Sequence, residues 1–503
     1  DRDGGVMKIE GLESEPGEMR VEAFDETNRM KTRSNPILCG DADREYSLFW
    51  TDLHGQTDST VGTGSVQEYF SFARAVGFVD ASTHQGNDFQ ITSEDWEEIV
   101  RGTRDFHAPG EFVTFLGYEW SGTTPGGGDH NVIYFSDDEP IRRSSHWQIP
   151  DAADEDMDCY PINNLYEALR NREALIIPHI GGRRANPDFH DPDLEPVIEI
   201  CSVHGRFEWF LQEALERGYR VGVIGAGDDH TGRPGASYGT SASFGVRGGL
   251  AGILAKSLTR EGIWEALRAR RTYATTGERI ILSVTSEGHH MGEEFCTARD
   301  PEIKVDVRGT GPLQSVQVVR GSEVVYDHPL IEPGDHCEDR IRVAWSGARL
   351  KSRGRHTDWT GRLTIEGGTF EAVREFAFDN PRHGVTRHTE TEIEWSSITC
   401  GDLDGLIVDI ADGGNPRVVF ESEPISFPFA LVDLKNGPIV RDAGGVEQKV
   451  EVSLARCQPG PECANFTFRD TSAMEGLNPY YVRVTQEDGE MAWSSPLYVD
   501  RDK

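Results

Sequence analysis

Between residues 46 and 280, short apolar segments alternate with segments of helical periodicity, and this alternation restricts the folds open to the chain. One unit begins at Ser65, which with Glu68 three residues later predicts a capping box at a helix start. The helix should end near Gly77, and the segment FVDAS after it predicts a strand. Such alternation is typical of a parallel sheet or barrel, where chemistry gathers at the C-terminal ends of the strands.

The pattern changes after about residue 280. Short alternating runs such as EIKVDVRG and GLIVDIADG, separated by Gly, Asp, Asn and Pro, predict a β-sandwich. We therefore expect an N-terminal β-arm or hairpin over 1–45, an α/β unit over 46–284 and an accessory β-sandwich over 285–503. Because no low-complexity linker separates the last two parts, they are expected to pack together.

The composition of the chain restricts the kinds of partner that it can bind. The formal net charge of −36 argues against nucleic acid, because binding phosphates requires a basic surface. The sequence has no run of eighteen apolar residues, which predicts a soluble protein with no membrane partner. The first residues lack the features of a secretory signal, so a cytoplasmic location is favoured over a secreted or periplasmic one, while the oligomeric state is not indicated. Cys457 and Cys463 could close a small loop, but free thiols are favoured.

Polar side chains follow nearly every predicted strand of the first half. A single histidine at a strand end is usually a surface or hydrogen-bonded residue. Six histidines lie at such ends, with carboxylates beside them, and this repetition predicts a metal centre. The histidines are His54, His84, His130, His179, His204 and His230, and the carboxylates include Asp52, Glu119, Asp129, Glu199 and Asp228.

These segments carry a set of motifs: Leu53-His54-Gly55-Gln56, Thr83-His84, Gly117-Tyr118-Glu119, His130-Asn131, Ala226 to His230, and Arg271 to Ile280. Together they resemble the PHP (polymerase and histidinol phosphatase) superfamily of metallohydrolases. The resemblance is strongest over residues 45 to 295, and it is closest to the large branch of unknown function that carries a C-terminal β-domain. It implies a distorted (β/α)7 TIM-like barrel holding two or three divalent ions, which could be manganese, zinc or iron.

The resemblance also assigns ligands. His54, Gln56, Glu119 and Asp228 would hold the first ion; Glu119 would bridge to a second, held also by His130 and His179; His84 and His230 fit a third. Two positions depart from the common pattern, since Gln56 replaces a histidine and Thr83 replaces an aspartate. A glutamine oxygen is a harder ligand than an imidazole nitrogen, which favours oxygen-preferring ions such as manganese.

The expected activity is hydrolysis of phosphate mono- or diesters with a small anionic substrate. Arg183, Arg206 and Arg233 follow candidate ligands and could bind the anion, although for each one taken alone a pairing with an acidic residue at the surface is favoured. His204 could be the general acid, or it could be bonded to Glu208. Two other functions remain open: hydrolysis of an amide, lactone or cyclic ester at the same centre, and a non-catalytic binding protein stabilised by metal.

Overall fold

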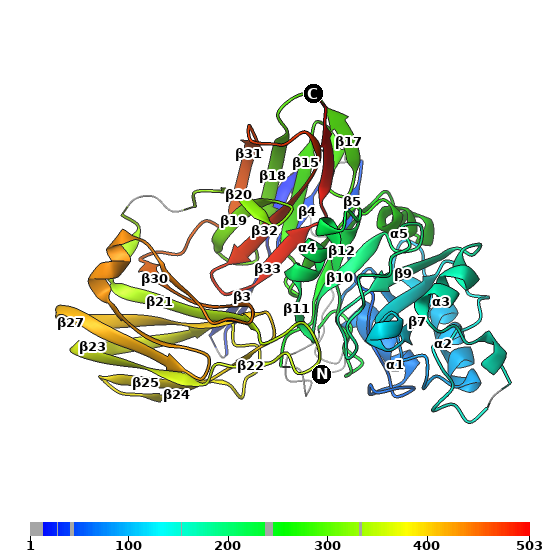
Figure 1. The fold of residues 1–503 in the computed structure, drawn as a ribbon, viewed down its shortest axis with the longest axis horizontal. Coiled ribbons are helices and arrows are strands. Elements are labelled where there is room, and N and C mark those ends of the chain that lie inside the picture. The colour runs from blue at the N-terminus through cyan, green and yellow to red at the C-terminus, as the bar shows by residue number, and fades with distance from the viewer. Residues whose placement is uncertain are drawn as a thin grey trace.

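The computed structural model describes residues 14–27, 29–40, 45–151, 153–236, 245–330 and 334–502. Five α-helices and thirty-four strands lie within these residues, so strands dominate the molecule. Helices α1, α2 and α3 gather at one end of the molecule, at the right of Figure 1, and the strands β23, β25 and β27 form the opposite end. The predicted N-terminal arm is described only from residue 14, and its residues 41–44 also lie outside the described ranges.

A 13-stranded sheet runs through the middle of the molecule and joins the two halves of the sequence. Its main path is β17 (Glu294–Thr297), β34 (Leu497–Arg501), β32 (Gly476–Gln486), β33 (Met491–Ser494), β14 (Thr272–Thr275), β13 (Leu250–Ala255), β5 (Ser47–Asp52), β6 (Ala81–Thr83), β7 (Val113–Ser121), β8 (Asp129–Tyr134) and β9 (Ala174–Pro178). The strands β19 (Leu313–Arg320) and β20 (Glu323–Asp327) branch from β32.

The prediction of a TIM-like (β/α)7 barrel is wrong. Within the central sheet, the described strands of the first half pair in parallel only at β5–β6 and β6–β7, whereas β7–β8, β8–β9, β5–β13 and β13–β14 are antiparallel. The short connection 122–128 between β7 and β8 explains one reversal, because a parallel crossover needs a dozen or more residues. The next strands, β11 (Gly205–Arg206), β10 (Val197–Ser202) and β12 (Gly222–Gly225), form a separate sheet, so no closed barrel forms among the described residues.

The helices pack on the first half, and α1, α2 and α5 begin at residues whose side chains cap them. α1 (Val66–Ala75) starts at the capping box of Ser65 and Glu68, and α2 (Ser93–Phe106) starts at a second one formed by Thr92 and Asp95. Each cap satisfies backbone N–H groups that lack partners in the first turn. The remaining helices are α3 (Ile162–Leu169), α4 (Glu208–Glu216) and α5 (Arg260–Arg268), with 3₁₀ turns at Thr124–Gly126, Glu155–Met157 and Leu431–Asn436.

Beyond β14, the described elements are strands and one 3₁₀ turn, but they do not form one sandwich. The sheet β16 (His289–His290), β15 (Ile281–Ser286), β18 (Glu302–Arg308) and β31 (Cys463–Arg469) shares a core with β19, β32 and β34 of the central sheet. That core contains Leu282, Val305 and Val482, all essentially buried.

An eight-stranded sheet makes a second all-β unit with its own core. Its strands are β24 (Gly384–His388), β25 (Glu392–Ser396), β23 (Gly361–Phe376), β27 (Leu403–Ser422), β21 (His336–Ala348), β30 (Val446–Arg456), β29 (Ile439–Asp442) and β28 (Ser426–Ala430), beside a short pair of β22 (Thr357–Asp358) and β26 (Ile398–Thr399). Trp345 and Trp395 stack in its interior at 4.7 Å between ring centroids. A disulfide joins Cys337 to Cys457, so the favoured free thiol at Cys457 is not what the structure contains.

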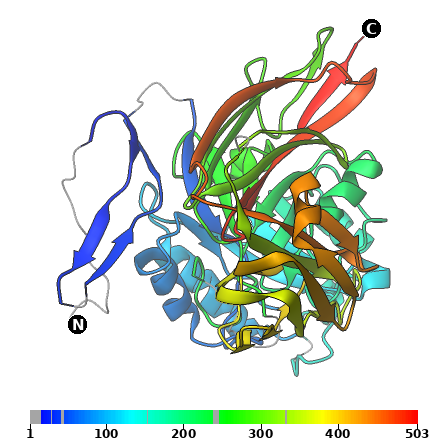
Figure 2. The ribbon, with the colours of Figure 1, turned by 90° about the vertical axis from the view of Figure 1, so that its left-hand side faces the viewer.

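The N-terminal segment forms two small antiparallel pairs, β1 (Gly17–Met19) with β4 (Ile37–Cys39) and β2 (Glu22–Asp25) with β3 (Met30–Arg33). Figure 2 shows it standing at one side of the molecule. Arg20 fastens it to the C-terminal half by donating to the carbonyl of Gly309 at 2.6 Å. Among the described residues, no helix has both the length and the hydrophobicity required to cross a bilayer.

Candidate metal centre

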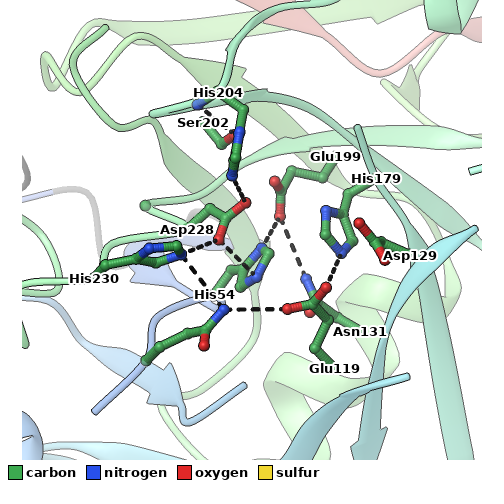
Figure 3. Close-up of polar contacts among 12 residues, drawn as sticks. His54, Glu119, Asp129, Asn131, His179, Glu199, Ser202, His204, Asp228 and His230 are labelled. Carbon is green, nitrogen blue, oxygen red and sulfur yellow. Dashed lines mark hydrogen bonds and ion pairs between the residues drawn. The ribbon is translucent and has the colours of Figure 1, made fainter. Parts of the chain in front are cut away.

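Ends of strands from two sheets bring the candidate ligands together. His54 follows β5, His179 follows β9, and Asp228 follows β12. Glu199 lies within β10 and is buried, as are the other three. Donor atoms of these four residues all lie within 4.8 Å of one another, close enough to hold one metal ion, and Figure 3 shows the side chains converging.

His54 lies between two carboxylates. Its Nδ1 is 3.0 Å from Oε2 of Glu199, and its Nε2 is 3.3 Å from Oδ1 of Asp228. Burial by itself disfavours the charged imidazole, but Asp228 and Glu199 outweigh burial and raise the pKa of His54 to about 10. Two negative charges therefore concentrate at a site that excludes water, which is the electrostatic environment that a divalent cation would neutralise.

Asp228 is the centre of the arrangement, because three imidazoles face its two oxygens. His54 and His230 approach Oδ1, at 3.3 Å and 3.4 Å, while His204 approaches Oδ2 at 3.1 Å. His204, Asp228 and His230 form a second group of potential ligands, so Asp228 is common to both groups. The backbone of Asp228 has a left-handed φ of 48°, which an aspartate tolerates better than most residues.

The loop that carries Asp228 is held in place by Asp52, the last residue of β5. The carboxylate of Asp52 accepts hydrogen bonds from the backbone N–H groups of Gly227, at 2.7 Å, and Gly235, at 2.8 Å. Burial raises the pKa of Asp52 to about 7, while these backbone bonds lower it. Asp52 is therefore a positioning residue, and the carboxylates that face the imidazoles come from other strands.

His179 is the clearest test of whether the residues fit a metal. It is buried, with 1% of its surface exposed, and neither ring nitrogen has a hydrogen-bond partner among the described residues. Burial, followed by the nearby charge of His54, lowers its pKa well below the usual range, so the imidazole is neutral. Neutral imidazole is the form that binds metal, and a buried polar ring without partners is costly unless a ligand satisfies it. The donor set therefore fits a divalent cation.

Glu119, the residue expected to bridge two ions, lies beside the cluster. Its Oε1 is 3.8 Å from Nε2 of His179 and 3.3 Å from Nη2 of Arg183. Its Oε2 accepts from the side-chain amides of Asn87, at 2.5 Å, and Gln56, at 3.2 Å. Burial raises the pKa of Glu119 well above its usual range, and the Asp129 charge adds to this. The carboxylate shared by the two ligand groups is thus Asp228, with Glu119 at their edge.

Gln56 points its amide nitrogen, and not its oxygen, toward the cluster. Nε2 donates to Glu119, while Oε1 accepts from the hydroxyl of Thr60 at 2.7 Å. In this arrangement Gln56 orients the Glu119 carboxylate and offers no oxygen to an ion, so the expected oxygen ligand is not realised here.

Arg183 is the one predicted arginine that reaches the cluster. Its guanidinium contacts both Asp129 and Glu119, and its backbone N–H donates to Asp129 at 2.6 Å. Arg206 faces away: it donates to the carbonyls of Ser202, at 3.1 Å, and Arg247, at 2.8 Å. Arg233 is exposed, and its backbone N–H donates to Asp229 at 2.8 Å.

Two predicted histidine ligands lie apart from the two groups. His84 is buried with Nε2 at 2.9 Å from the Thr57 hydroxyl, and burial lowers its pKa to about 3. His130 directs Nδ1 toward the carbonyl of Gly128, at 3.2 Å, and Nε2 toward Glu195, at 3.6 Å. Their nitrogens are therefore occupied by other partners.

Glu199 is the residue that sequence reasoning placed at a strand end but did not select as a ligand. The sequence feature that could have identified it is the segment VIEICS, in which one charged residue interrupts an apolar strand. In the structure every residue of this strand is buried. A buried carboxylate requires a partner, which here is His54.

A cavity of about 560 Å³ opens beside the cluster. Glu119, Arg183, His204, Asp228 and His230 line it. Residues 353–356, which come from the C-terminal half of the chain, line it as well. The volume falls within the range typical of small-molecule sites.

Comparison with solved structures finds a two-domain protein of Bacteroides vulgatus, described as containing a predicted PHP-like metal-dependent phosphoesterase. The match has a TM-score of 0.36 and 12% identity, and covers 78% of this chain and 98% of that one. This likeness is too distant to carry functional weight.

Comparison with curated sequences finds relatives in chlamydiae. An uncharacterized protein of Chlamydia pneumoniae is 28% identical over 345 residues, which is 62% of this chain and 54% of that protein. One of Chlamydia muridarum is 24% identical over 358 residues, 65% of this chain and 55% of that protein. The chain spans about half the length of these relatives. The family described as "Protein of unknown function (DUF3604)" matches residues 23–185 and 236–350, more than half of the chain, and the protein therefore belongs to the DUF3604 family.

Proposed function

We propose that the protein is a metal-dependent hydrolase of phosphate mono- or diesters, related in its chemistry to PHP-like phosphoesterases. The observation that carries the proposal is the buried group of His54, His179, Glu199 and Asp228, with donor atoms within 4.8 Å of one another. A purely structural ion would need no cavity beside it, whereas Asp228 of this group lines one.

The first ion would be held by these four residues. A second would be held by His204, Asp228 and His230, so that Asp228 serves both positions. Divalent ions at such a site polarise a phosphoryl oxygen and lower the pKa of bound water, which is the chemistry that ester hydrolysis requires. Manganese, zinc and iron all suit a mixed set of imidazoles and carboxylates.

The remaining residues would bind and orient the substrate. Arg183 lines the cavity and is held in place by Asp129 and Glu119, so its guanidinium is pre-organised toward an anion. A phosphoryl group presents several negative oxygens to such a donor, and bidentate contact between arginine and phosphate is strong. This supports a phosphate ester over a neutral ester or lactone.

The role of His204 is tested by metal stoichiometry. As a ligand of the second ion, His204→Ala should lower the metal content of the folded protein. If the content stays at the wild-type value while activity depends more steeply on the leaving group, His204 is instead the general acid expected from the sequence.

The test of the function combines elemental analysis with a substrate panel. Purified protein should contain at least one divalent ion per chain and should hydrolyse phosphate mono- or diesters in preference to carboxylic esters and lactones. Chelation should abolish turnover, and manganese, zinc or iron should restore it. His179→Ala should lose metal and activity, whereas His289→Ala, a matched change at a partly exposed histidine in the C-terminal half, should lose neither. Metal-free protein with full activity would refute the proposal, and metal-loaded protein without turnover would favour a binding role.

A further inference from the structure

The loop 349–356, between β21 and β22, contributes residues 353–356 to the lining of the cavity, although Arg355 lies 151 residues from His204 in the sequence. The loop is closed on itself by a backbone hydrogen bond from Arg349 N–H to the Arg355 carbonyl, at 2.8 Å. Gly354 sits at its tip with φ of 79°, a conformation that favours glycine. The loop is therefore a defined turn, and the matched family segments end at residue 350, before its tip.

Arg355 fastens this loop to the segments that carry the candidate ligands. Its guanidinium donates to the carbonyls of Ile180, at 3.0 Å, and Gly181, at 2.7 Å, the two residues after His179. It also donates to the carbonyl of His204 at 3.3 Å. With only 5% of its surface exposed, Arg355 holds the loop in a fixed relation to the cluster.

Arg353 and His356 flank this anchor and line the cavity. Both are exposed, so their polar ends are available to a molecule in the cavity. The cavity volume of about 560 Å³ is much larger than a phosphoryl group, so a substrate that contacts Asp228 has room for a second group that reaches the loop.

The positive charge available in the cavity lies on the loop. Arg183 is offset by Asp129 and Glu119. In the part of the chain that the structure describes, no carboxylate pairs with Arg353, and the donors of Arg355 go to backbone carbonyls. In a chain with a net charge of −36, two arginines without acidic partners at one cavity wall create a local attraction for anions.

We propose that Arg353 and His356 bind a second anionic group of the substrate, so that the cavity selects small phosphate esters that also carry a carboxylate or a similar anion. This inference deepens the proposed function and rests on it for the position of the phosphoryl group. The eight-stranded unit would then contribute to substrate recognition through this loop.

Binding of non-hydrolysable probes to the metal-loaded full chain tests this independently of turnover. The probes are two matched pairs: 3-phosphonopropionate with propylphosphonate, and 4-phosphonobutyrate with butylphosphonate. Within a pair, the first compound has a carboxylate where the second has a methyl group. Wild-type protein should bind at least one carboxylated probe about tenfold more tightly than its partner, as a charge-assisted contact predicts.

Arg353→Ala should abolish this preference, and His356→Ala should reduce it, with metal content unchanged in both. Arg374→Ala removes an exposed arginine of β23 that does not line the cavity, and it should keep the preference. Equal binding within both pairs, or a preference that survives in an Arg353→Ala/His356→Ala double variant, would overturn the inference. Phosphoester turnover with no carboxylate preference would support the proposed function and contradict the inference. A carboxylate preference without turnover would support binding of a second anion and contradict the proposed function.

Discussion

Nε2 of His204 lies 3.1 Å from Oδ2 of Asp228, the carboxylate oxygen that His54 and His230 do not approach. The aspartate thus presents both of its oxygens to imidazoles, and it belongs to both groups of candidate ligands. Because one carboxylate belongs to both groups, changing Asp228 is the most direct test of the proposed metal centre.

Asp228→Asn should lower occupancy at both metal positions, because the amide removes a negative charge and replaces one acceptor with a donor. Turnover should fall by more than the roughly 10- to 100-fold typical of residues that only orient a ligand. Glu119→Gln, at the edge of the cluster, should lose less metal. Elemental analysis of the two folded variants measures the metal lost from each. A greater loss from Glu119→Gln would show that Glu119, and not Asp228, bridges the two ions.

Arg183→Ala should destabilise the protein as well as weaken substrate binding, because Asp129 and Glu119 would lose their shared cation. The side chain of Arg183 is 31% exposed, so we expect a loss of about 2 kcal/mol, below the 3–5 kcal/mol for breaking a fully buried pair. Urea unfolding gives the value. Arg183→Lys keeps the charge and should recover part of it, and a variant as stable as wild type would show that the pair adds nothing.

Truncation at residue 285 should give insoluble protein. The strand β14 would lose its partner β33, and the core around Trp209 and Phe210 would lose Tyr481 and Trp493. A milder variant keeps the test informative: Trp493→Ala should lower the free energy of unfolding by about 3–5 kcal/mol. Soluble, metal-binding protein from the truncated chain would show that the first half is independent.

Stability should depend on pH through Asp402, a buried carboxyl directly before β27. Burial raises its pKa to about 7, and the charge of Asp379 adds to the rise. The folded carboxyl keeps a proton that the unfolded chain releases near pH 4, so its contribution is fully present below that pH and is lost as pH rises to about 7.

Asp402→Asn should therefore flatten the decline of stability between about pH 4 and 7, by up to about 1.4 kcal/mol per pH unit. Urea unfolding at several pH values, with a chelator in every sample, measures this without a contribution from metal. Parallel curves for the variant and the wild type would mean that Asp402 is ionised in the fold.

Local patterns in the sequence predicted local structure well. The capping box of Ser65 and Glu68 does begin α1, and Val66, Tyr69, Phe70 and Ala73 form its buried face. Val76, three residues after Ala73, is 43% exposed, because the helix ends before it. Helix caps and hydrophobic periodicity depend on residues within one or two turns, so they can be predicted from the sequence.

The direction in which neighbouring strands pair could not be predicted in the same way. The same apolar run can pair parallel or antiparallel, and the choice depends on connection length and on distant partners. The pairing of β14 with β33 joins segments that lie far apart in the sequence, and hydrophobic periodicity does not predict such a pairing. The alternation predicted a parallel sheet or barrel and the family resemblance implied the barrel, whereas the described strands form an open mixed sheet.

For the site, the expectation that strand-end histidines converge identified His54, His179, His204 and His230 with Asp228. His84 and His130 share the same sequence signature but bond to Thr57 and Gly128 instead. Which imidazole turns inward depends on side-chain packing, which motif spacing does not encode.

The contact of Met491 with Thr276, a backbone N–H donating to a hydroxyl across 215 residues of sequence, has a consequence for biosynthesis. The ribosome makes the chain from the N-terminus, so β14 emerges long before β33 and waits with an unpaired edge during translation. Such an edge can pair with other chains until β33 and the strands around it are made. Substrate-binding capacity should accordingly appear only after synthesis of those strands.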